Sequence, residues 1–475
     1  MKNRYKLFTL IAFTAMIISC RKTEDLNVDY SSFNADNPTT NTPLDSWLKT
    51  NFLDEYNIEV VYRYNRYYHG NTANVVPNKL ENIQPTMQMV LDGFISPYRK
   101  IAGETFTKKY MPKEWVLFGS YSYANTSDPG VAGTAAAGRR ITLYGVNDYQ
   151  PLPAGQFYAW DRQRIMHHEF GHILNQIIPI PTDFEAISAG FYKQPYESTP
   201  TDSARRNGFV TSYASGQPGE DYAESVSYPL INGQVWYDDW SNFSNTAGRN
   251  RLVQKENNVI NYFKNLGIDY KELQREVQKY MISIGRNESK FAYWLNKNRT
   301  PLITPLPNPA PAAVPTFRTL TMNLESDLYT TYGNPADFAA AYNAFKAAVL
   351  AYSATQKYHL DYIQLRFDST TGITVRAAFS NATTQYFGDY SFSMAATTAT
   401  GETTFTKVAN GTGTTFNNGA LFTAAFTSTI QAYLTGKTFV ADWLPVNINA
   451  DNYMKYAGFT VKGAPTNYFY GPLAY

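Results

Sequence analysis

The sequence predicts an α+β protein built from two folded parts. Its 475 residues suffice for two domains, and 44% hydrophobic residues can fill two cores, whereas 17% charged residues is too few for a disordered polyelectrolyte. Patterns typical of helices and of strands occur on both sides of a proline-rich segment. We therefore expect a mixed N-terminal domain, followed by a C-terminal α+β accessory domain rich in β-structure.

The first twenty residues are typical of an export signal. Lys2, Arg4 and Lys6 precede an apolar run at 7–18, which is too short to span a bilayer comfortably. The run ends in Ile-Ile-Ser-Cys, which resembles a bacterial lipobox, and Cys20 is the only cysteine of the chain. We expect Cys20 to be acylated, so that the protein is exported and lipid-anchored to the outer membrane, at the cell surface. The alternative is an ordinary signal peptide with an incidental cysteine.

Two low-complexity segments set the expected domain boundaries. Residues 21–43 are rich in Asn, Asp, Ser, Thr and Pro, without apolar periodicity, as in a flexible tether. Residues 301–316 carry proline at nearly every second or third position, which suits a semi-rigid linker. A long ordered loop is the alternative to this linker. The expected domains are therefore 44–300 and 317–475, after a signal peptide at 1–20.

The N-terminal domain is expected to mix strands and helices. Apolar and aromatic runs predict three strands, at 58–64, 115–123 and 140–144. Helical spacing, caps and breakers predict four helices, at 83–101, 161–178, 257–266 and 269–281. Asp161 is expected to cap the second of these helices and Pro179 to end it, while Gly267 separates the last two. Asp269 with Glu272 resembles a capping box.

The C-terminal domain is expected to combine a hairpin with two helices. Alternating residues at 362–367 and 373–379, separated by Ser-Thr-Thr-Gly, predict the hairpin. Asn334-Pro335 begins one helix, and Ala420–Leu434 forms another that Gly436 closes. This pattern leaves open whether the domain holds a substrate, docks on an importer or only packs against its neighbour.

Three of the five histidines lie in one stretch, Met-His-His-Glu-Phe-Gly-His, at 166–172. His168 and His172 are four residues apart, so on a helix they project from the same face and can bind one ion. Zn²⁺ accepts such nitrogens, and Glu169 beside the first ligand can accept a proton from water. We interpret His167 as structural, and expect the missing side chain of Gly171 to allow a close approach. The alternatives are a metal site that has lost its catalytic activity and a metal site that is purely structural.

A third zinc ligand is expected from a later helix. The two remaining histidines, His69 and His359, sit in no recognisable ligand context, so we expect a carboxylate. Glu220 and Glu224 follow Pro218-Gly219 and are also four residues apart. One of them can bind zinc while the other accepts a hydrogen bond from a ligating imidazole. A solvated acidic helix face is the competing interpretation.

The two motifs together resemble a known class of enzymes. His-Glu-Phe-Gly-His, with the later Ser-Tyr and Glu-Asp-Tyr-Ala-Glu, is similar to the gluzincin metallopeptidases, such as the catalytic domain of anthrax lethal factor. Most of the chain resembles the substrate import-associated zinc metallohydrolase lipoproteins, found beside importers of the SusC/SusD type. The resemblance implies a zincin-like fold for the first domain. It also implies zinc ligands His168, His172 and Glu220, general base Glu169, a Tyr213 that stabilises the oxyanion, and a Glu224 that accepts a hydrogen bond from a ligating imidazole.

These observations predict an outer-membrane zinc metallopeptidase that hydrolyses peptides or glycopeptides in support of nutrient import. The resemblance implies a SusC/SusD-type TonB-dependent importer as partner. A net charge of +2 from scattered basic residues gives no footprint for nucleic acid. Two alternatives stay open. The aromatic content of 16% also suits a non-enzymatic surface protein that captures glycans or peptides, and the zinc site could hydrolyse another amide or ester bond.

Overall fold

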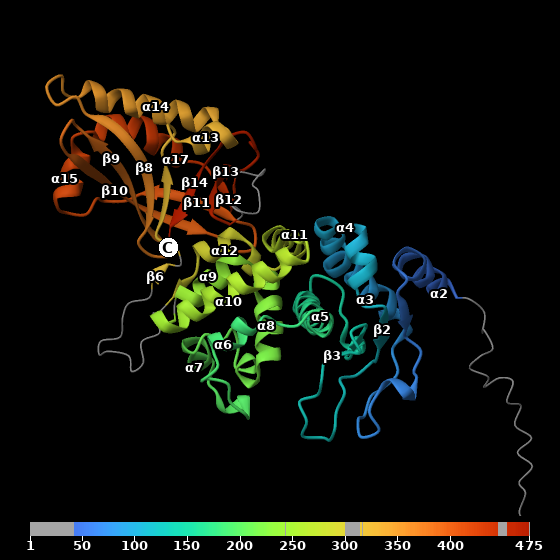
Figure 1. Ribbon diagram of the computed structural model, residues 1–475. Helices are drawn as coiled ribbons and strands as arrows, with labels where there is room; N and C mark the ends of the chain where they lie inside the picture. The colour runs from blue at the N-terminus through green and yellow to red at the C-terminus, as the bar shows by residue number, and fades with distance from the viewer. Residues whose placement is uncertain (1–41, 243, 300–313, 316, 445–453, 475) are drawn as a thin grey trace, which may run out of the picture. The chain divides into compact units, whose positions relative to one another are not determined.

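A computed structural model describes residues 42–242, 244–299, 314–315, 317–444 and 454–474. The predicted signal peptide with Cys20, the tether up to residue 41 and all but Val314–Pro315 of the proline-rich segment lie outside these ranges. The predicted α+β class is confirmed, with a mixed N-terminal domain and a C-terminal β-barrel (Figure 1). The predicted domain boundaries stay predictions.

The described residues divide into two units, one that ends at Thr50 and one that begins at Asn51. In the first unit, helix α2 (Pro43–Leu48) begins with a capping box. The Thr42 hydroxyl accepts from the Asp45 N–H at 3.2 Å, and the Asp45 carboxylate accepts from the Thr42 N–H at 3.0 Å. These two bonds satisfy backbone donors that the first turn of a helix leaves free.

The second unit begins with a four-stranded sheet in the order β1-β2-β4-β3. Its strands are β1 (Glu59–Val61), β2 (Glu114–Leu117), β4 (Arg140–Leu143) and β3 (Gly133–Ala136). The first three are parallel, and β3 runs antiparallel to β4 at one edge. The strands predicted at 58–64 and 115–123 are shorter than expected. After Leu117 the backbone pairs with a loop instead, as the Gly119 N–H donates to the Val76 carbonyl.

Helices cover this sheet and continue beyond it. The chain from Ile83 to Tyr110 forms α3 (Ile83–Val90), a helical segment at Leu91–Ile95 and α4 (Ser96–Tyr110), which is kinked at Gly103, where φ is 80°. Seven further helices follow: α5 (Gln156–Ile177), α6 (Thr182–Ile187), α7 (Thr201–Arg206), α8 (Pro218–Asn232), α9 (Gln234–Asn242), α10 (Thr246–Asn265) and α11 (Tyr270–Ser283). The expected break at Gly267 is confirmed, and Asp269 caps α11 by accepting from two backbone N–H groups.

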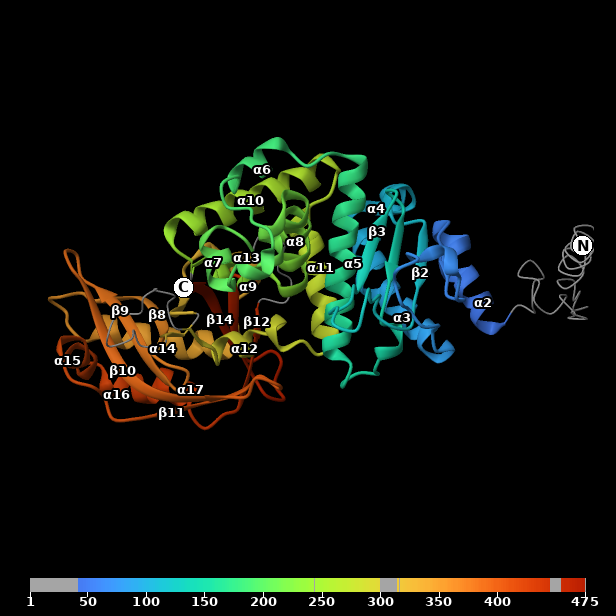
Figure 2. The same cartoon turned by 90° about the horizontal axis from the view of Figure 1, so that it is seen from below.

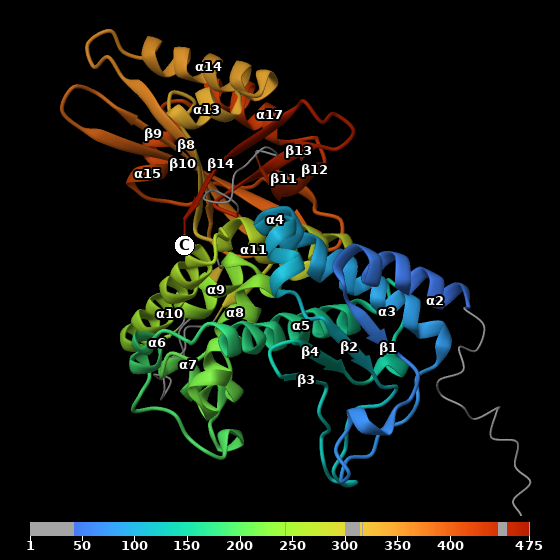
Figure 3. The same ribbon diagram turned by 45° about the vertical axis from the view of Figure 1, so that its right-hand side comes forward.

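Helix α5 lies between the sheet and the later helices. It packs against β3 and β4 on one side and against α8 on the other (Figures 2 and 3). The prediction that Asp161 caps this helix is wrong, because the helix begins one and a half turns earlier, after Gly155. Asp161 instead pairs with Arg164 within the helix. Ile177, the last helical residue, is 46% exposed.

Three buried side chains of helix α11 donate hydrogen bonds to the backbone of α8. Tyr270, Gln274 and Gln278 recur every four residues and therefore face α8 together. Each donates a hydrogen bond of 2.7–2.8 Å to an α8 carbonyl, at Val226, Pro229 and Leu230 respectively. Because Pro229 cannot complete the helical ladder, this external support fixes α8 where its own backbone bonding is interrupted.

The C-terminal domain is a closed barrel of eight antiparallel strands in the order β10-β11-β12-β13-β14-β7-β8-β9. The strands are β7 (Thr319–Met322), β8 (His359–Phe367), β9 (Gly372–Ser380), β10 (Gln385–Ala396), β11 (Glu402–Lys407), β12 (Phe439–Trp443), β13 (Tyr456–Val461) and β14 (Tyr468–Ala474). The predicted hairpin is confirmed as β8–β9. Pairing of β14 with β7 closes the barrel.

Short helices accompany the barrel. Asn334-Pro335 precedes α14 (Ala336–Ala351), as expected, and α14 contacts β8. The other helical segments are α12 (Phe291–Leu295), α13 (Asp327–Tyr332), α15 (Thr414–Ala420), α16 (Thr423–Phe426), Thr427–Gln431 and α17 (Ala432–Leu434). Within the described residues, no helix combines the length and hydrophobicity that a bilayer crossing requires.

A fully buried ion pair joins α8 to α10. Lys255 and Asp221 are both 0% exposed, and their charged atoms lie 2.7 Å apart. Asp221 also accepts from the Tyr192 hydroxyl at 2.8 Å, and Lys255 donates to the Gly208 carbonyl at 2.7 Å. Burial raises the pKa of Asp221 and lowers the pKa of Lys255, because the ion pair offsets only part of the desolvation.

Removing one partner of this ion pair is expected to be strongly destabilising. Lys255→Met should lower the free energy of unfolding by about 3–5 kcal/mol, because Asp221 would be left buried and unpaired. Urea unfolding followed by circular dichroism measures this change. Lys264→Met, on the exposed side of the same helix, is the control and should stay within about 1 kcal/mol of wild type. Equal effects of the two substitutions would contradict the structural role of the pair.

Candidate metal centre

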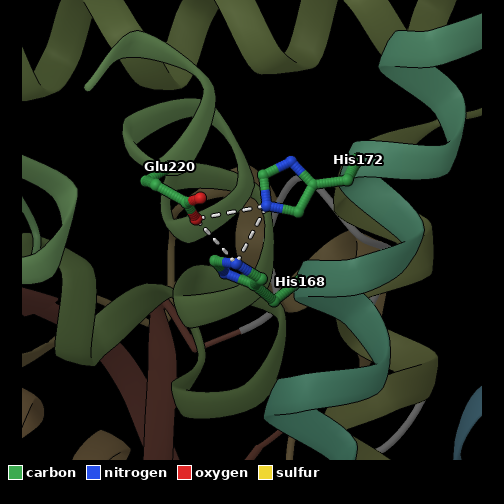
Figure 4. A group of neighbouring side chains, drawn as sticks. All are labelled: His168, His172 and Glu220. Atoms are coloured by element: carbon green, nitrogen blue, oxygen red, sulfur yellow. Dashed lines mark hydrogen bonds and ion pairs between the residues drawn. The ribbon is translucent and has the colours of Figure 1, made fainter. Parts of the chain in front are cut away.

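Three side chains from two helices converge on one point. His168 and His172 come from α5, and Glu220 comes from the first turn of α8 (Figure 4). The two Nε2 atoms lie 3.1 Å apart, and Oε2 of Glu220 lies 3.1 Å from His168 Nε2 and 3.2 Å from His172 Nε2. The structure thus brings together the three residues predicted as zinc ligands. Within the described chain they are the one group of His, Cys, Asp or Glu found close enough to share a metal ion.

The dimensions of this triangle suit zinc. Ligands about 2.0–2.1 Å from a tetrahedral metal ion stand about 3.3 Å from one another. The observed spacings of 3.1–3.2 Å lie close to that value. Two imidazole nitrogens and a carboxylate oxygen are also the atoms that zinc accepts in catalytic sites with three protein ligands. The donor set therefore fits the metal ion that the sequence predicts.

Local sequence explains how the ligands reach this arrangement. The interval of four residues on α5 aligns the two imidazoles. Gln217 is extended at the start of α8, and its side chain donates to Oε1 of Glu220 at 3.1 Å, which leaves Oε2 facing the histidines. Gly171 lies between the ligands, where a Cβ atom would meet Cα of Ala223 at 3.4 Å. The close approach expected at Gly171 is thus made by the α8 backbone.

Glu224 contacts His168 at the ring nitrogen that does not face the triangle. Its Oε1 lies 2.9 Å from Nδ1 of His168, on the side of the ring that faces away from the triangle. Its Oε2 accepts from the Thr211 hydroxyl at 2.7 Å, and Thr211 in turn accepts from the Ala214 N–H at 3.0 Å. Although burial alone favours the neutral ring, Glu220 and Glu224 raise the pKa of His168 to about 10.

Glu169 is buried beside the triangle and lines the same cavity as His168. The Ala135 N–H, on edge strand β3, donates to its carboxylate and fixes the side chain. Burial raises the pKa of Glu169 above its usual range, against the effect of the neighbouring histidines. The close contact of α5 with β3 depends on Gly133, because a Cβ atom there would lie 2.4 Å from Cγ2 of Ile165.

Tyr213 lies on the open side of the centre. Its side chain is 38% exposed, and its ring centroid lies 6.0 Å from that of His168. Partial burial raises the pKa of the phenol, as does its hydrogen bond to the Glu220 carboxylate. Tyr196 packs edge-on against Tyr213 with centroids 5.0 Å apart. Tyr213 is thus the tyrosine that the structure places beside the ligands, as the resemblance implied.

A cavity of about 530 Å³ opens beside these residues. Its walls come from α5, from the chain before β3 and from the segment that carries Tyr213. Sequence reasoning missed several side chains in or around it: Arg164, Tyr196, Thr211, Gln217 and Tyr228. Thr211 and Gln217 lie close in the sequence to the predicted Tyr213 and Glu220, and this position is the one signal that could have indicated them. Nothing in the sequence around Arg164 or Tyr196 indicates a place in the site.

The other histidines lie outside the triangle. His167 is buried, its Nδ1 lies 3.3 Å from the Tyr98 hydroxyl, and burial lowers its pKa to about 3. This environment agrees with the structural interpretation of His167. His69 contacts Tyr64, and His359 pairs with Asp361 in the barrel.

Loss of the Thr211 hydroxyl should weaken metal binding. In Thr211→Val the shape is kept, but Glu224 loses the donor that orients it toward His168, so zinc affinity should fall about 10-fold or more. Competition titration with a chromophoric chelator measures this affinity. Ser212→Ala, which removes the neighbouring hydroxyl, should bind zinc like wild type. Unchanged affinity in Thr211→Val would show that Glu224 is oriented without it.

A match to a family of known proteins agrees with the metal centre described above. Residues 37–271 match a family described as "Putative zinc-binding metallo-peptidase". A crystal structure of a putative zinc-binding metallo-peptidase from Bacteroides caccae is 27% identical, covering 50% of this chain and 92% of that chain, with a TM-score of 0.43. No curated protein matches the chain. The matched residues include the three side chains of the triangle, His168, His172 and Glu220.

Proposed function

We propose that the protein is a zinc-dependent metallopeptidase whose ligands are His168, His172 and Glu220. The observation that carries the proposal is the triangle of ligand atoms at 3.1–3.2 Å, with Glu169 beside it on the wall of an open cavity. A structural zinc site has four protein ligands and no open position, whereas a catalytic site has three. Three converging ligands next to a cavity therefore favour catalysis over a structural role.

Each side chain has a distinct task in this proposal. Bound zinc supplies Lewis-acid chemistry, because it lowers the pKa of water toward about 7 and polarises a carbonyl group. Glu169 accepts the proton of the attacking water and returns it to the leaving amine. The Tyr213 phenol donates to the oxygen that becomes negative during attack. Glu224 holds the His168 ring in its ligating orientation.

We infer peptides or glycopeptides as substrates, since β3 is an edge strand beside the site and the aromatic walls of the cavity suit an extended chain. The same chemistry applies to other amide or ester bonds, because the site supplies a nucleophile and an electrophile without fixing the acyl group. A peptide library is therefore the appropriate first substrate.

We further propose that the protein is exported, anchored to the outer membrane through acylated Cys20, and supplies a SusC/SusD-type TonB-dependent importer with cleaved peptides. The support is the sequence at 1–20, where basic residues, a short apolar run and the lone cysteine follow one another. The tether at 21–43 would hold the enzyme away from the lipid surface.

Replacement of the general base should separate catalysis from metal binding. Glu169→Gln in the soluble form that lacks residues 1–20 should bind one zinc per chain but lower kcat on a cleaved library peptide by about 100-fold or more. Elemental analysis and mass spectrometry of the products provide the two readouts.

Glu220→Ala is the matched control for the ligand role, and it should lose both zinc and activity. Glu224→Ala should lose much less zinc than Glu220→Ala. Full activity in Glu169→Gln would refute its assignment as base, and absence of zinc from the wild type after incubation with it would refute the proposed function.

The anchor has its own test. Cys20→Ser in the full-length precursor should abolish metabolic labelling with palmitate and move the protein from the detergent phase to the aqueous phase, because acyl chains supply the membrane affinity. Ser19→Ala leaves the cysteine in place and should stay labelled. If the wild type is unlabelled and soluble after export, the peptide at 1–20 is an ordinary signal and the anchor is disproved.

A further inference from the structure

One face of helix α5 continues past the metal ligands along the cavity. Trp160, Arg164 and His168 follow one another at intervals of four residues, so their side chains leave the same face of the helix. All three line the cavity. Four helical residues advance about 6 Å along the axis, which is about two residues of an extended peptide. The proposed mechanism uses His168 but neither Arg164 nor Trp160.

The Arg164 guanidinium is held in place within this cavity. Its Nη2 donates to Oδ1 of Asp161 at 2.9 Å, and its Nη1 lies 3.8 Å from Oε1 of Glu224. The Tyr228 ring centroid is 5.8 Å from its Cζ. The side chain remains 22% exposed, and Arg164 is the only lysine or arginine among the described residues that line the cavity.

Each of the two carboxylates near Arg164 also contacts a second positively charged or ligating side chain. Oδ2 of Asp161 lies 3.4 Å from the buried guanidinium of Arg162, whose strongest other contacts are the Tyr144 carbonyl and the Tyr121 hydroxyl, which are neutral. One aspartate therefore serves two arginines. Oε1 of Glu224 is 2.9 Å from His168 and 3.8 Å from Arg164, so its closer partner is the histidine. Arg164 thus keeps positive charge and donor capacity toward the cavity.

Two aromatic side chains line the cavity together with this cation. Trp160 donates its indole N–H to Asn232 at 3.0 Å, which fixes the ring, and the Tyr228 ring centroid lies 5.8 Å from the guanidinium carbon of Arg164. Apolar walls lower the local dielectric, so a charged hydrogen bond made between them is stronger than one made in water. A planar guanidinium in such a setting matches the two oxygens of a carboxylate.

We propose that Arg164, together with Trp160 and Tyr228 in the lining of the same cavity, forms a subsite for a substrate carboxylate within about two residues of the scissile bond. The carboxylate is either an aspartate or glutamate side chain or the C-terminal carboxylate of a short peptide. This inference rests on the proposed function and specifies its substrate class: acidic peptides.

A peptide library gives the first readout. The zinc-loaded soluble form, which lacks residues 1–20, is incubated with an equimolar synthetic library prepared with free and with amidated C termini. We expect Asp and Glu to be enriched at one position within two residues of the cleaved bond, or cleavage confined to sites near a free C terminus. The first result identifies the side-chain carboxylate and the second the terminal carboxylate, and an absence of both overturns the proposal.

Matched peptides then test Arg164 itself. For a peptide pair that differs only in Glu against Gln, or in acid against amide, wild type should show a kcat/KM ratio of 10 or more, typical of a charged hydrogen bond. Arg164→Met should bring this ratio to near 1, and Arg164→Lys should leave it in between. Arg249→Met, an exposed arginine outside the cavity, should leave rate and ratio unchanged.

Two further readouts separate the ways of failing. If Arg164→Met lowers both peptides equally, or loses zinc by elemental analysis, Arg164 supports Glu224 and Asp161 and the subsite is disproved. Binding of the same pair to Glu169→Gln, measured by calorimetry, does not require turnover. Selective binding of the acidic peptide without any hydrolysis by wild type would uphold the subsite and refute the peptidase. Equal binding of both peptides would refute the subsite.

Discussion

The separation between helices α5 and α8 is the constraint on which the metal centre depends. Two ligands lie on one helix and the third on the other, so a shift of about 1 Å between the axes would spoil distances that a metal site holds within about 0.2 Å. Gly171 lies at this contact, where an added Cβ atom would already be in van der Waals contact with Cα of Ala223, at 3.4 Å. Larger side chains at that position would have to separate the helices.

Several buried polar contacts resist such a movement. The donors on α11 hold α8 from behind, the Lys255–Asp221 pair ties its first turn to α10, and Gln217 fixes the Glu220 carboxylate. Glu224 and Thr211 connect the same helix to the segment that carries Tyr213. Ligands, supporting carboxylate and tyrosine therefore belong to one connected network, in which a change at one member is transmitted to the others.

The parts of this arrangement that depend on local spacing could be predicted from the sequence. Intervals of four residues aligned His168 with His172 and Glu220 with Glu224, and the hairpin at β8–β9 followed from alternation. The start of α5 was misplaced because Asp161 is a good capping residue by type, whereas the helix uses Gly155 and leaves Asp161 to pair with Arg164. Residue type alone does not reveal which of two local hydrogen bonds a side chain will make.

Contacts between distant segments could not be predicted. Barrel closure pairs Leu320 with Leu473, and no pattern near either residue specifies its partner. Tyr213 was one of 38 tyrosines and was singled out only by resemblance. Arg164 lay unnoticed within the predicted helix, because its significance comes from the cavity that β3 and Tyr228 complete around it.

The same network explains why this site must be embedded in a large core. Glu169, Glu224, His168, Asp221 and Lys255 are all less than 9% exposed, and burying ionisable groups is unfavourable even when they are paired. Two imidazole nitrogens and a carboxylate oxygen within 3.2 Å of one another also need a shared proton or a metal ion to hold them together. The rest of the fold must therefore stabilise the triangle. The aromatic packing around α5 and the hydrogen bonds from α11 to α8 provide this stability. A metal ion that binds only the folded chain adds to the stability of the fold. Metal binding therefore stabilises the same arrangement of helices that forms the site.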